Sequence, residues 1–515
     1  MKHSHQLDYL FDPNTVAVIG ASNSFGKWGF DMTMSVANSP RKRNIYPINS
    51  SASEVLGLKA YPNIKDVPEL VDLAVITVPP EIVPSVMQDC ADKGVKTALI
   101  ASAGLSEIGE DGAELESKIV DIAQSGGIRF IGPNSMGHFN IADGLFTTPW
   151  LPEMKKGSVS IISQSGNCGV YSLYLGAEMG IGFNKFVSSG NEANLCLEDY
   201  LEYFAQDDGT KVILAYVEGL RDGRRFLELS KEITKTKPII ILKAGKTEAG
   251  KKATMSHTAS LSGSEVIHNA AFKQAGVIVV DEIDEMIDVA GALLRQPLPR
   301  SNRVGILTAG GGFGVLATDA CEKMGVEICE LSTSTIDRIS EILPSRWSHG
   351  NPVDTVAAYL ATFPCLWALM DDENVDSILL SGVVGTAAVI PKLNGVPQET
   401  IDLVEQLVKM REVEDEKCWD EALQRMEESK KPIILLAMAP EEMKHTPLYR
   451  KLSDNGMMMY PSPMRAARAL AHLVEYSEYL RSTANGSSKK GLKDEHSRAS
   501  SHKRRRGGNT HNKPS

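Results

Sequence analysis

The chain has 515 residues, a length that predicts about three domains. Its 42% hydrophobic and 23% charged residues are typical of a globular protein, and its seven scattered cysteines, without a Cys-x-x-Cys pair, predict neither a disulfide framework nor a zinc site. No apolar run approaches the roughly 18 residues of a membrane span, and residues 1–6 lack an apolar signal segment, so we expect a cytoplasmic protein that does not enter a membrane.

Charge is unevenly distributed along the chain. Residues 481–515 hold ten Lys/Arg and two Asp/Glu, so a formal net charge of −11 overall becomes −19 before residue 481. An acidic body of this kind argues against nucleic acid as the main ligand. The tail is rich in Ser, Gly and Asn and nearly devoid of apolar residues, which predicts a basic disordered end over 481–515. Its run Lys503-Arg-Arg-Arg506 could also contact nucleic acid or an acidic partner.

Short β-branched runs alternate with helical patterns from the start of the chain. The first five predicted strands are 15–19, 44–46, 73–78, 97–100 and 128–131, with helices such as 84–93 and 112–124 between them. Strands that alternate with helices of this length predict a parallel sheet covered by helices on both faces. The first such unit is expected to span residues 1–150.

The same alternation continues in two further units. Strands 159–162, 185–187, 212–217, 239–242 and 277–280 predict a second unit over 151–298, closed by the proline-containing linker 296–300. Strands 304–308, 377–380, 432–436 and 457–460, followed by a last helix from Pro463 to about Tyr479, predict a third unit over 299–480. The fold class we expect is therefore α/β, with three doubly wound units in series.

The loop Gly20-Ala-Ser-Asn-Ser-Phe-Gly26-Lys27 directly follows the first predicted strand. A dinucleotide fingerprint fails because position 22 is serine and no acid follows the second strand, which runs into Tyr46-Pro-Ile-Asn49. A Walker A loop fails because Trp28 stands where Ser or Thr is needed. A glycine turn with a lysine still suits a phosphorylated ligand, and a tight turn without any ligand is the alternative.

Three more strand ends of the first unit carry small or kinked loops, namely 78–80, 101–104 and 132–137. Because the carboxyl ends of parallel strands meet at one edge of a sheet, these loops predict an open crevice of the kind that a nucleotide ligand needs. Each loop alone is a weak signal, since Pro and Gly are ordinary loop residues.

In the second unit, the segments 162–167 and 187–194 are each expected to lead from a strand into a helix, whose N-terminus would attract an anion. His257 lies in a loop of small and hydroxylated residues that follows the strand-like run 238–243. A neutral imidazole is a competent nucleophile near pH 7, although most histidines do no chemistry. Glu218 ends a strand and could orient that imidazole, or it could be a solvated acid. In the third unit, 307–314 and 351–354 could serve a ligand or form turns.

Taken in order, these motifs resemble the α subunit, or α half, of the NDP-forming acyl-CoA synthetases, especially the ADP-forming acetate–CoA ligases, which are relatives of succinyl-CoA synthetase. The resemblance runs from about residue 10 to about residue 479. Its motifs are Gly20-Ala-Ser22 with Gly26-Lys27, Tyr46-Pro-Ile-Asn49, Val78-Pro79, Ser102-Ala-Gly104, Gly132-Pro-Asn134, Ser163-Gln-Ser-Gly166, Glu218-Gly219, Ser256-His-Thr258, Asn351-Pro-Val-Asp354 and Tyr460-Pro-Ser-Pro463.

The resemblance implies a Rossmann-like CoA-binding domain followed by two flavodoxin-like domains. It implies CoA contacts from Gly20, Ser22, Lys27, Asn49, Val78, Pro79, Ser102 and Gly104, and a substrate contact from Asn134. It makes His257 the histidine that is phosphorylated during turnover and Glu218 the carboxylate that orients it. Ser165, Gly166 and Asn167 are then expected to cradle the phosphoryl group.

The chemistry implied by the resemblance converts acyl-CoA, ADP and phosphate reversibly into a carboxylic acid, CoA and ATP. It passes through an acyl phosphate and a phosphohistidine, with acetate as the default acid. The family holds its nucleotide on an ATP-grasp domain, which the motifs of this chain do not include. The resemblance therefore implies a separate ATP-grasp β subunit in an α2β2 or similar assembly, with ADP/ATP and Mg²⁺ bound there and no metal on this chain.

Three residues depart from the family pattern: Ser135 stands where cysteine is frequent, Ala259 where glycine is common, and Asn194 where aspartate is frequent. These changes leave the choice of acyl group open. Two other classes of protein compete with a ligase. The first is a non-catalytic CoA-binding or acyl-CoA-binding regulator on the same fold, and the second is a NAD-dependent dehydrogenase that uses the first unit.

Overall fold

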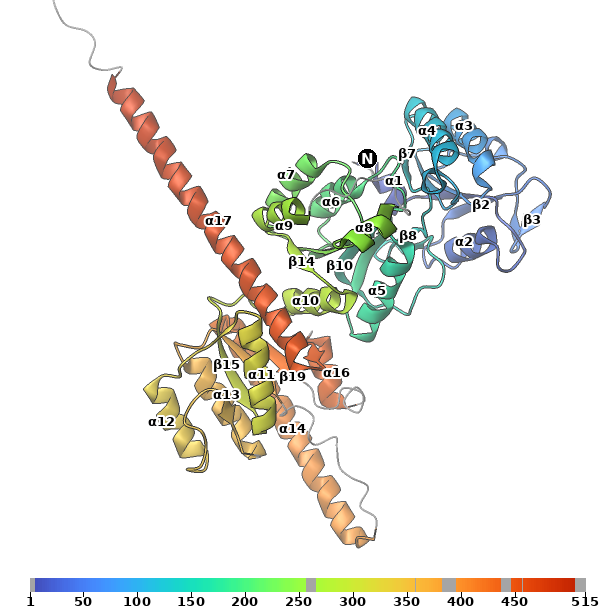
Figure 1. Ribbon diagram of the computed structural model, residues 1–515. Helices are drawn as coiled ribbons and strands as arrows, with labels where there is room; N and C mark the ends of the chain where they lie inside the picture. The colour runs from blue at the N-terminus through green and yellow to red at the C-terminus, as the bar shows by residue number, and fades with distance from the viewer. Residues whose placement is uncertain are drawn as a thin grey trace, which may run out of the picture.

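The computed structural model describes residues 5–255, 265–356, 358–381, 395–436, 446–455 and 457–504. Within these ranges the chain forms three successive, mainly parallel sheets, each flanked by helices (Figure 1). The predicted fold class, α/β with doubly wound units, is confirmed. No helix in the described ranges combines the length and the apolar character needed to cross a membrane.

The first sheet has the strand order β2-β1-β5-β6-β7, and all of its pairs are parallel. Its strands are β1 (Thr15–Ile19), β2 (Asn44–Ile48), β5 (Leu73–Ile76), β6 (Thr97–Ile100) and β7 (Arg129–Ile131), and a separate hairpin pairs β3 (Glu54–Val55) with β4 (Leu58–Lys59). β1, β5 and β6 are buried at every position, as expected for parallel strands covered on both faces. Because the order reverses at β1, a crevice is expected beyond the carboxyl ends of β1 and β5.

The helices of the first unit lie on both faces of this sheet (Figure 1). They are α1 (Asp8–Phe11), α2 (Trp28–Ala37), α3 (Val83–Lys93) and α4 (Glu110–Ser125), with the short 3₁₀ helices η1 (Ile64–Asp66), η2 (Pro80–Ile82) and η3 (Ser106–Ile108).

The second sheet has the order β14-β13-β12-β10-β11-β8-β9. Its strands are β8 (His138–Asn140), β9 (Leu145–Phe146), β10 (Lys156–Ser163), β11 (Phe183–Ser188), β12 (Val212–Val217), β13 (Ile239–Lys243) and β14 (Ile278–Val280). Residues 138–146, which fall before the predicted boundary at residue 150, pair with this sheet because β8 runs antiparallel to β11. Phe139 of β8 stacks on Phe186 of β11 with ring centroids 5.4 Å apart, a contact that alternation along the chain does not reveal.

The helices of the second unit connect these strands. They are α5 (Gly166–Glu178), α6 (Leu197–Gln206), α7 (Gly223–Ile233), α8 (Glu248–Met255), α9 (Glu265–Gln274) and α10 (Ile283–Arg295). α5 and α7 begin where the side chains of Ser165 and Asp222 accept hydrogen bonds from backbone N–H groups of the first turn.

The third sheet has the order β16-β15-β18-β19-β20, with β17 paired to the end of β15. Its strands are β15 (Arg303–Thr308), β16 (Glu327–Ile328), β17 (Val353–Asp354), β18 (Ser377–Ser381), β19 (Ile433–Leu436) and β20 (Met459–Tyr460). Its helices are α11 (Gly311–Lys323), α12 (Thr333–Ile342), η4 (Tyr359–Ala361), α13 (Thr362–Asp371), α14 (Gln398–Ser429), α16 (Pro447–Asp454) and α17 (Pro463–Arg504).

α17 extends beyond its predicted end near Tyr479, so the tail that the sequence marks as disordered begins as a continuation of this helix (Figure 1). Propagation of a helix adds one hydrogen bond per residue once the first turns are held by packing, and no proline interrupts the chain between Met464 and Arg504. The first turns are held firmly, because Arg465 pairs with Asp288 of α10 through contacts of 2.6 and 2.8 Å.

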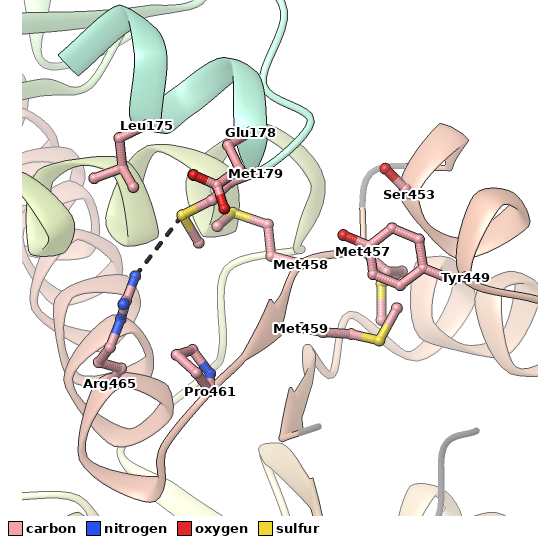
Figure 2. A pocket seen from close by; sticks show the side chains of 10 residues that line it. All are labelled: Leu175, Glu178, Met179, Tyr449, Ser453, Met457, Met458, Met459, Pro461 and Arg465. Atoms are coloured by element: carbon pink, nitrogen blue, oxygen red, sulfur yellow. Dashed lines mark hydrogen bonds between the residues drawn. The ribbon is translucent and has the colours of Figure 1, made fainter. Parts of the chain in front are cut away.

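A methionine-lined cavity of about 240 Å³ marks the junction between the second and third units (Figure 2). Met179 at the end of α5 lies beside Met458, with Met457 and Met459 also lining the cavity, and an Arg465 nitrogen lies 3.7 Å from the Met179 sulfur. Methionine is flexible and fills irregular gaps, so it suits a junction between two separately built units.

Candidate active site

A cavity of about 650 Å³ lies beyond the carboxyl ends of β1, β5 and β6, at the point where the order of the first sheet reverses. Of the residues that the sequence predicts for CoA or substrate, this cavity is lined by Gly20, Lys27, Val78, Pro79, Ser102 and Asn134. The strand-end loops therefore converge on one crevice.

A second cavity of about 330 Å³ adjoins the first one and shares Gly20 and Val78 with it. Asn49 directly follows β2, is the last residue of the motif Tyr46-Pro-Ile-Asn49, and lines this second cavity. Its side chain donates to the Ala21 carbonyl at 2.8 Å and accepts from the N–H groups of Ser51 and Ala52, both at 2.8 Å. Asn49 thus ties the glycine loop to the end of β2.

Gly20 lines both cavities. It has φ +90°, and a Cβ atom there would lie 2.7 Å from the hydroxyl oxygen of Thr77. The backbone can follow this course without a clash only because residue 20 lacks a side chain. The loop then runs to Lys27, which is exposed and precedes the first turn of α2. A helix N-terminus with a lysine beside it offers N–H groups and positive charge to a phosphate group.

Ser22 and Gly104 are predicted CoA contacts that do not line either cavity. The Ser22 hydroxyl accepts a hydrogen bond from the Ser24 N–H at 3.0 Å and shapes the glycine loop. The Gly104 N–H donates to a Glu107 carboxylate oxygen at 2.6 Å and so holds the loop after β6. Both residues therefore stabilise loops of the first unit and are not part of the cavity lining.

The predicted phosphoryl cradle lies at the N-terminus of α5. The Ser165 side chain caps the helix, Gly166 is its first residue, and Asn167 is exposed in its first turn. A Cβ atom on Gly166 would lie 2.3 Å from the Met136 side chain, and Met136 lines the larger cavity. The two predicted sites, which lie in different units, are therefore neighbours across this contact. Sequence reasoning missed Met136, because nothing in its local pattern points to α5.

Glu218 directly follows β12 and is half-buried. The Lys243 ammonium at the end of β13 donates to the Glu218 carbonyl at 2.7 Å. Burial lowers the pKa of Lys243, and the Glu218 carboxylate opposes that effect. Burial also raises the pKa of the Tyr216 phenol well above its usual range, and the neighbouring Cys168 and Glu218 side chains add to the rise.

Gln164 joins the ends of β10 and β12 and was missed in the sequence. Its amide oxygen accepts from the N–H groups of Glu218 at 2.5 Å and Gly219 at 3.0 Å, and its amide nitrogen donates to the Gly219 carbonyl at 2.8 Å. The available signal was a glutamine between two serines at a strand end, which spacing alone does not distinguish from a loop residue.

His257, the predicted nucleophile, lies outside the described residues. β13 pairs in parallel with β12 so that Lys243 lies opposite Val217, and α8 then carries the described chain to Met255. The segment that contains residue 257 thus comes after β13, and the end of β13 lies next to the end of β12, which Glu218 follows.

The segment 187–194 differs from its prediction as a second anion-binding helix start. α6 begins only at Leu197, and the loop before it hydrogen-bonds to the first unit. The N–H groups of Asn191 and Ala193 donate to the carbonyls of Pro133 and Gly132 at 2.9 and 3.1 Å. This part of the prediction is wrong, because those N–H groups are occupied by backbone partners and join two units.

Comparison with known proteins agrees with this arrangement. A family model described as a CoA binding domain matches residues 14–140, and one described as a succinyl-CoA ligase like flavodoxin domain matches residues 156–293. The α subunit of the ADP-forming acetate–CoA ligase II of Pyrococcus furiosus is 39% identical over 93% of this chain and 100% of its own length. The ADP-forming acetate–CoA ligase of Methanocaldococcus jannaschii is 44% identical over 68% of this chain, which spans only 49% of that relative.

Among solved structures, the dinucleotide-forming acetyl-coenzyme A synthetase 1 of Korarchaeum cryptofilum, in complex with phosphate and ADP, superposes with a TM-score of 0.77. It is 31% identical, and the match covers 94% of this chain and 99% of that one. This extent of similarity in sequence and in structure identifies the protein family of the chain. The chain belongs to the family of the α subunits of ADP-forming acetate–CoA ligases.

Proposed function

We propose that this chain, together with a partner subunit, interconverts acyl-CoA, ADP and phosphate with a carboxylic acid, CoA and ATP. The observation that carries the proposal is the contact between Met136 and Gly166, which sets the predicted CoA cavity beside the predicted phosphoryl cradle. A reaction that forms an acyl phosphate from acyl-CoA needs these two sites within reach of each other.

In the first step, a phosphate oxygen attacks the thioester carbonyl, the C–S bond breaks, and CoA leaves as its thiolate. The products are acyl phosphate and CoA. The N–H groups of the N-cap residue Ser165 and of Gly166 and Asn167 in the first turn of α5 are suited to hold the phosphate and to stabilise its charge during the attack. Lys27 and the N-terminus of α2 are suited to bind a phosphate group of CoA, with Gly20, Val78, Pro79 and Ser102 shaping the cavity.

In the second step, an imidazole nitrogen of His257 attacks the phosphorus and the carboxylate leaves. Glu218 accepts a hydrogen bond from the other ring nitrogen, which keeps the attacking nitrogen deprotonated and stabilises the charged product. In the third step the phosphoryl group passes from His257 to ADP. A phosphoramidate is energy-rich, so this transfer needs no large loss of free energy. The support for His257 is its place in the family motif Ser256-His257-Thr258.

The nucleotide site is proposed to lie on a separate β subunit with an ATP-grasp fold, in an α2β2 or similar assembly. The single-chain relative of M. jannaschii, of which this chain spans about half, supports a missing partner half. ADP or ATP and Mg²⁺ then bind on the partner, where Mg²⁺ would screen the phosphate charges. Within the described ranges, no cluster of three His, Cys, Asp or Glu suits a metal ion.

Acetate is the acid that the names of the relatives support, and larger acids remain alternatives that the assay must include. Location in the cytoplasm stays a prediction of the sequence.

The test is ATP formation by the co-purified complex, supplied with acetyl-CoA, ADP, phosphate and Mg²⁺. We expect His257→Ala to abolish ATP formation and Glu218→Gln to lower kcat by a factor of about 10² or more, because both remove a group that acts on the phosphoryl transfer. Binding of CoA should survive in both variants. A wild-type complex that binds CoA but forms no ATP would favour the regulatory protein, and tight NADH binding without CoA binding would favour the dehydrogenase.

A further inference from the structure

In the second sheet, β10 and β12 end side by side at the point where the strand order reverses. The side chain of Gln164 connects these two strand ends. Gln164 follows β10 and makes three hydrogen bonds to the turn that follows β12. Two of them bring both N–H groups of the Glu218–Gly219 turn onto a single amide oxygen, and the third returns from the amide nitrogen to the Gly219 carbonyl. The backbone on either side of the Glu218 side chain is thereby fixed.

A buried carboxyl lies near this amide. Glu192 is 5% exposed, adopts φ +55° and accepts a hydrogen bond from the Ser189 hydroxyl at 2.7 Å, while its second carboxyl oxygen has no hydrogen-bond partner among the described residues. Burial raises the pKa of Glu192 to about 7, although Ser189 and the Gln164 amide act in the opposite direction. The three hydrogen bonds to the Glu218–Gly219 turn therefore hold the Gln164 amide in one orientation, with the Glu192 carboxyl nearby.

We propose that Gln164 is a positioning residue that aims the Glu218 carboxylate at the phosphoryl-transfer site. This inference rests on the proposed function. A carboxylate at the end of a strand can turn with its backbone, and a fixed turn restricts the directions in which it can accept a proton from an imidazole. Groups that orient a catalytic ligand or base from behind typically change activity by about 10- to 100-fold when they are removed.

The first test compares Gln164→Met with Gln296→Met in the complex with the partner subunit. Gln296 is a matched control, because its amide also bridges two elements: it accepts from the Ile433 N–H at 2.9 Å and donates to the Met457 sulfur at 2.9 Å. We expect Gln164→Met to lower the rate of His257 phosphorylation by about 10- to 100-fold with an unchanged KM for CoA. We expect Gln296→Met to lower only the melting temperature.

The second test is Gln164→Glu, which keeps an acceptor for both N–H groups and loses the donor to Gly219. Its new carboxyl faces Glu192 and Glu218, with Arg221 and Lys243 as the nearby cations. Protonation restores the donor and removes the repulsion, so the rate of this variant relative to the wild type should rise as the pH falls. A merely structural role for Gln164 would leave that ratio independent of pH.

The outcomes separate the two claims. If the wild type forms phosphohistidine and Gln164→Met reacts at the rate of Gln296→Met, the role of Gln164 is refuted while the proposed function stands. If the wild type binds CoA but is never phosphorylated, the proposed function falls and this inference falls with it. Should Gln164→Met fail to fold, a flat pH ratio for Gln164→Glu would refute the inference.

Discussion

Gly20 shows how a single residue can shape the predicted CoA cavity. Its left-handed φ turns the chain out of β1, and the missing side chain lets the backbone pass the end of β5 at Thr77. The same feature gives two neighbouring cavities a shared wall. The sequence pattern alone allowed a tight turn without a ligand, and the cavity volumes are what favour the ligand.

Gly20→Ala is therefore expected to impair CoA binding more than it impairs folding. A non-glycine residue with positive φ costs about 1–2 kcal/mol, and the new Cβ would also have to displace Thr77. Gly57→Ala is the control, because Gly57 has φ +78° with no atom within 4 Å of the added Cβ and lies in the β3–β4 turn. Calorimetric titration should show an affinity for CoA at least about tenfold weaker for Gly20→Ala. Equal affinities for the two variants would contradict this role of Gly20.

At the scale of elements, the contact between α5 and the loop after β7 joins the first unit to the second unit beside the larger cavity. α5 presents its N-terminus, and Met136 of the loop touches Gly166 from the CoA side. The loop is held in turn by the segment before α6, which donates to the carbonyls of Gly132 and Pro133. The predicted CoA cavity and the predicted phosphoryl cradle, which belong to units built on separate sheets, thus meet at this contact.

This arrangement predicts a compensating pair of substitutions. Gly166→Ala places a Cβ 2.3 Å from the Met136 side chain, so either α5 or the loop must shift. We expect the formation of acyl phosphate to slow by about tenfold or more. Its rate is measured as the release of CoA in a single turnover. Because the clash is with a flexible side chain, Gly166→Ala combined with Met136→Ala should recover part of the loss, measured as a double-mutant cycle. A double variant no faster than Gly166→Ala would show that the contact does not link the sites.

How far the sequence predicts the site depends on whether the information is local. The loops at 20–27, 78–80, 101–104 and 132–137 were expected to converge, because parallel strands end at one edge of a sheet, and they line or shape the cavity as expected. Three other features depend on partners distant in the chain. They are the pairing of β8 with β11, the hydrogen bonds of Gln164 to the turn after β12, and the hydrogen bonds of the 187–194 loop to the first unit. Periodicity and turn signals carry no information about such partners.

At the scale of the whole molecule, α17 clamps the second unit to the third. Its His472 Nε2 donates to a Glu285 carboxylate oxygen of α10 at 3.0 Å, and the ring also lies 3.4 Å from Glu475, while Arg468 lies 3.7 Å from Glu285. Burial opposes a charged imidazole here, but the hydrogen bond to Glu285 and the negative charges of Glu285 and Glu475 outweigh it and raise the pKa of His472 to about 9. The clamp therefore includes a histidine that is charged at neutral pH.

A pH dependence of stability follows from that raised pKa. The folded pKa lies above the unfolded value of 6.5, so the stabilisation is complete below pH 6.5 and is lost as the pH rises through about 9. The shift corresponds to no more than about 3 kcal/mol. Melting temperatures of the wild type and of His472→Gln should differ most at pH 6 and converge towards pH 10. A difference that stays constant over this range would rule out the charged clamp.

The most direct test of the account is phosphoryl labelling of His257. The chain and its co-purified partner are incubated with acetyl-CoA and radiolabelled phosphate, beside a His257→Ala complex that still binds CoA. The account predicts an acid-labile, base-stable label on the wild-type chain alone, and its loss when ADP is added. An unlabelled wild type, across a panel of acyl-CoAs and with the partner and CoA binding demonstrated, would contradict the phosphohistidine mechanism.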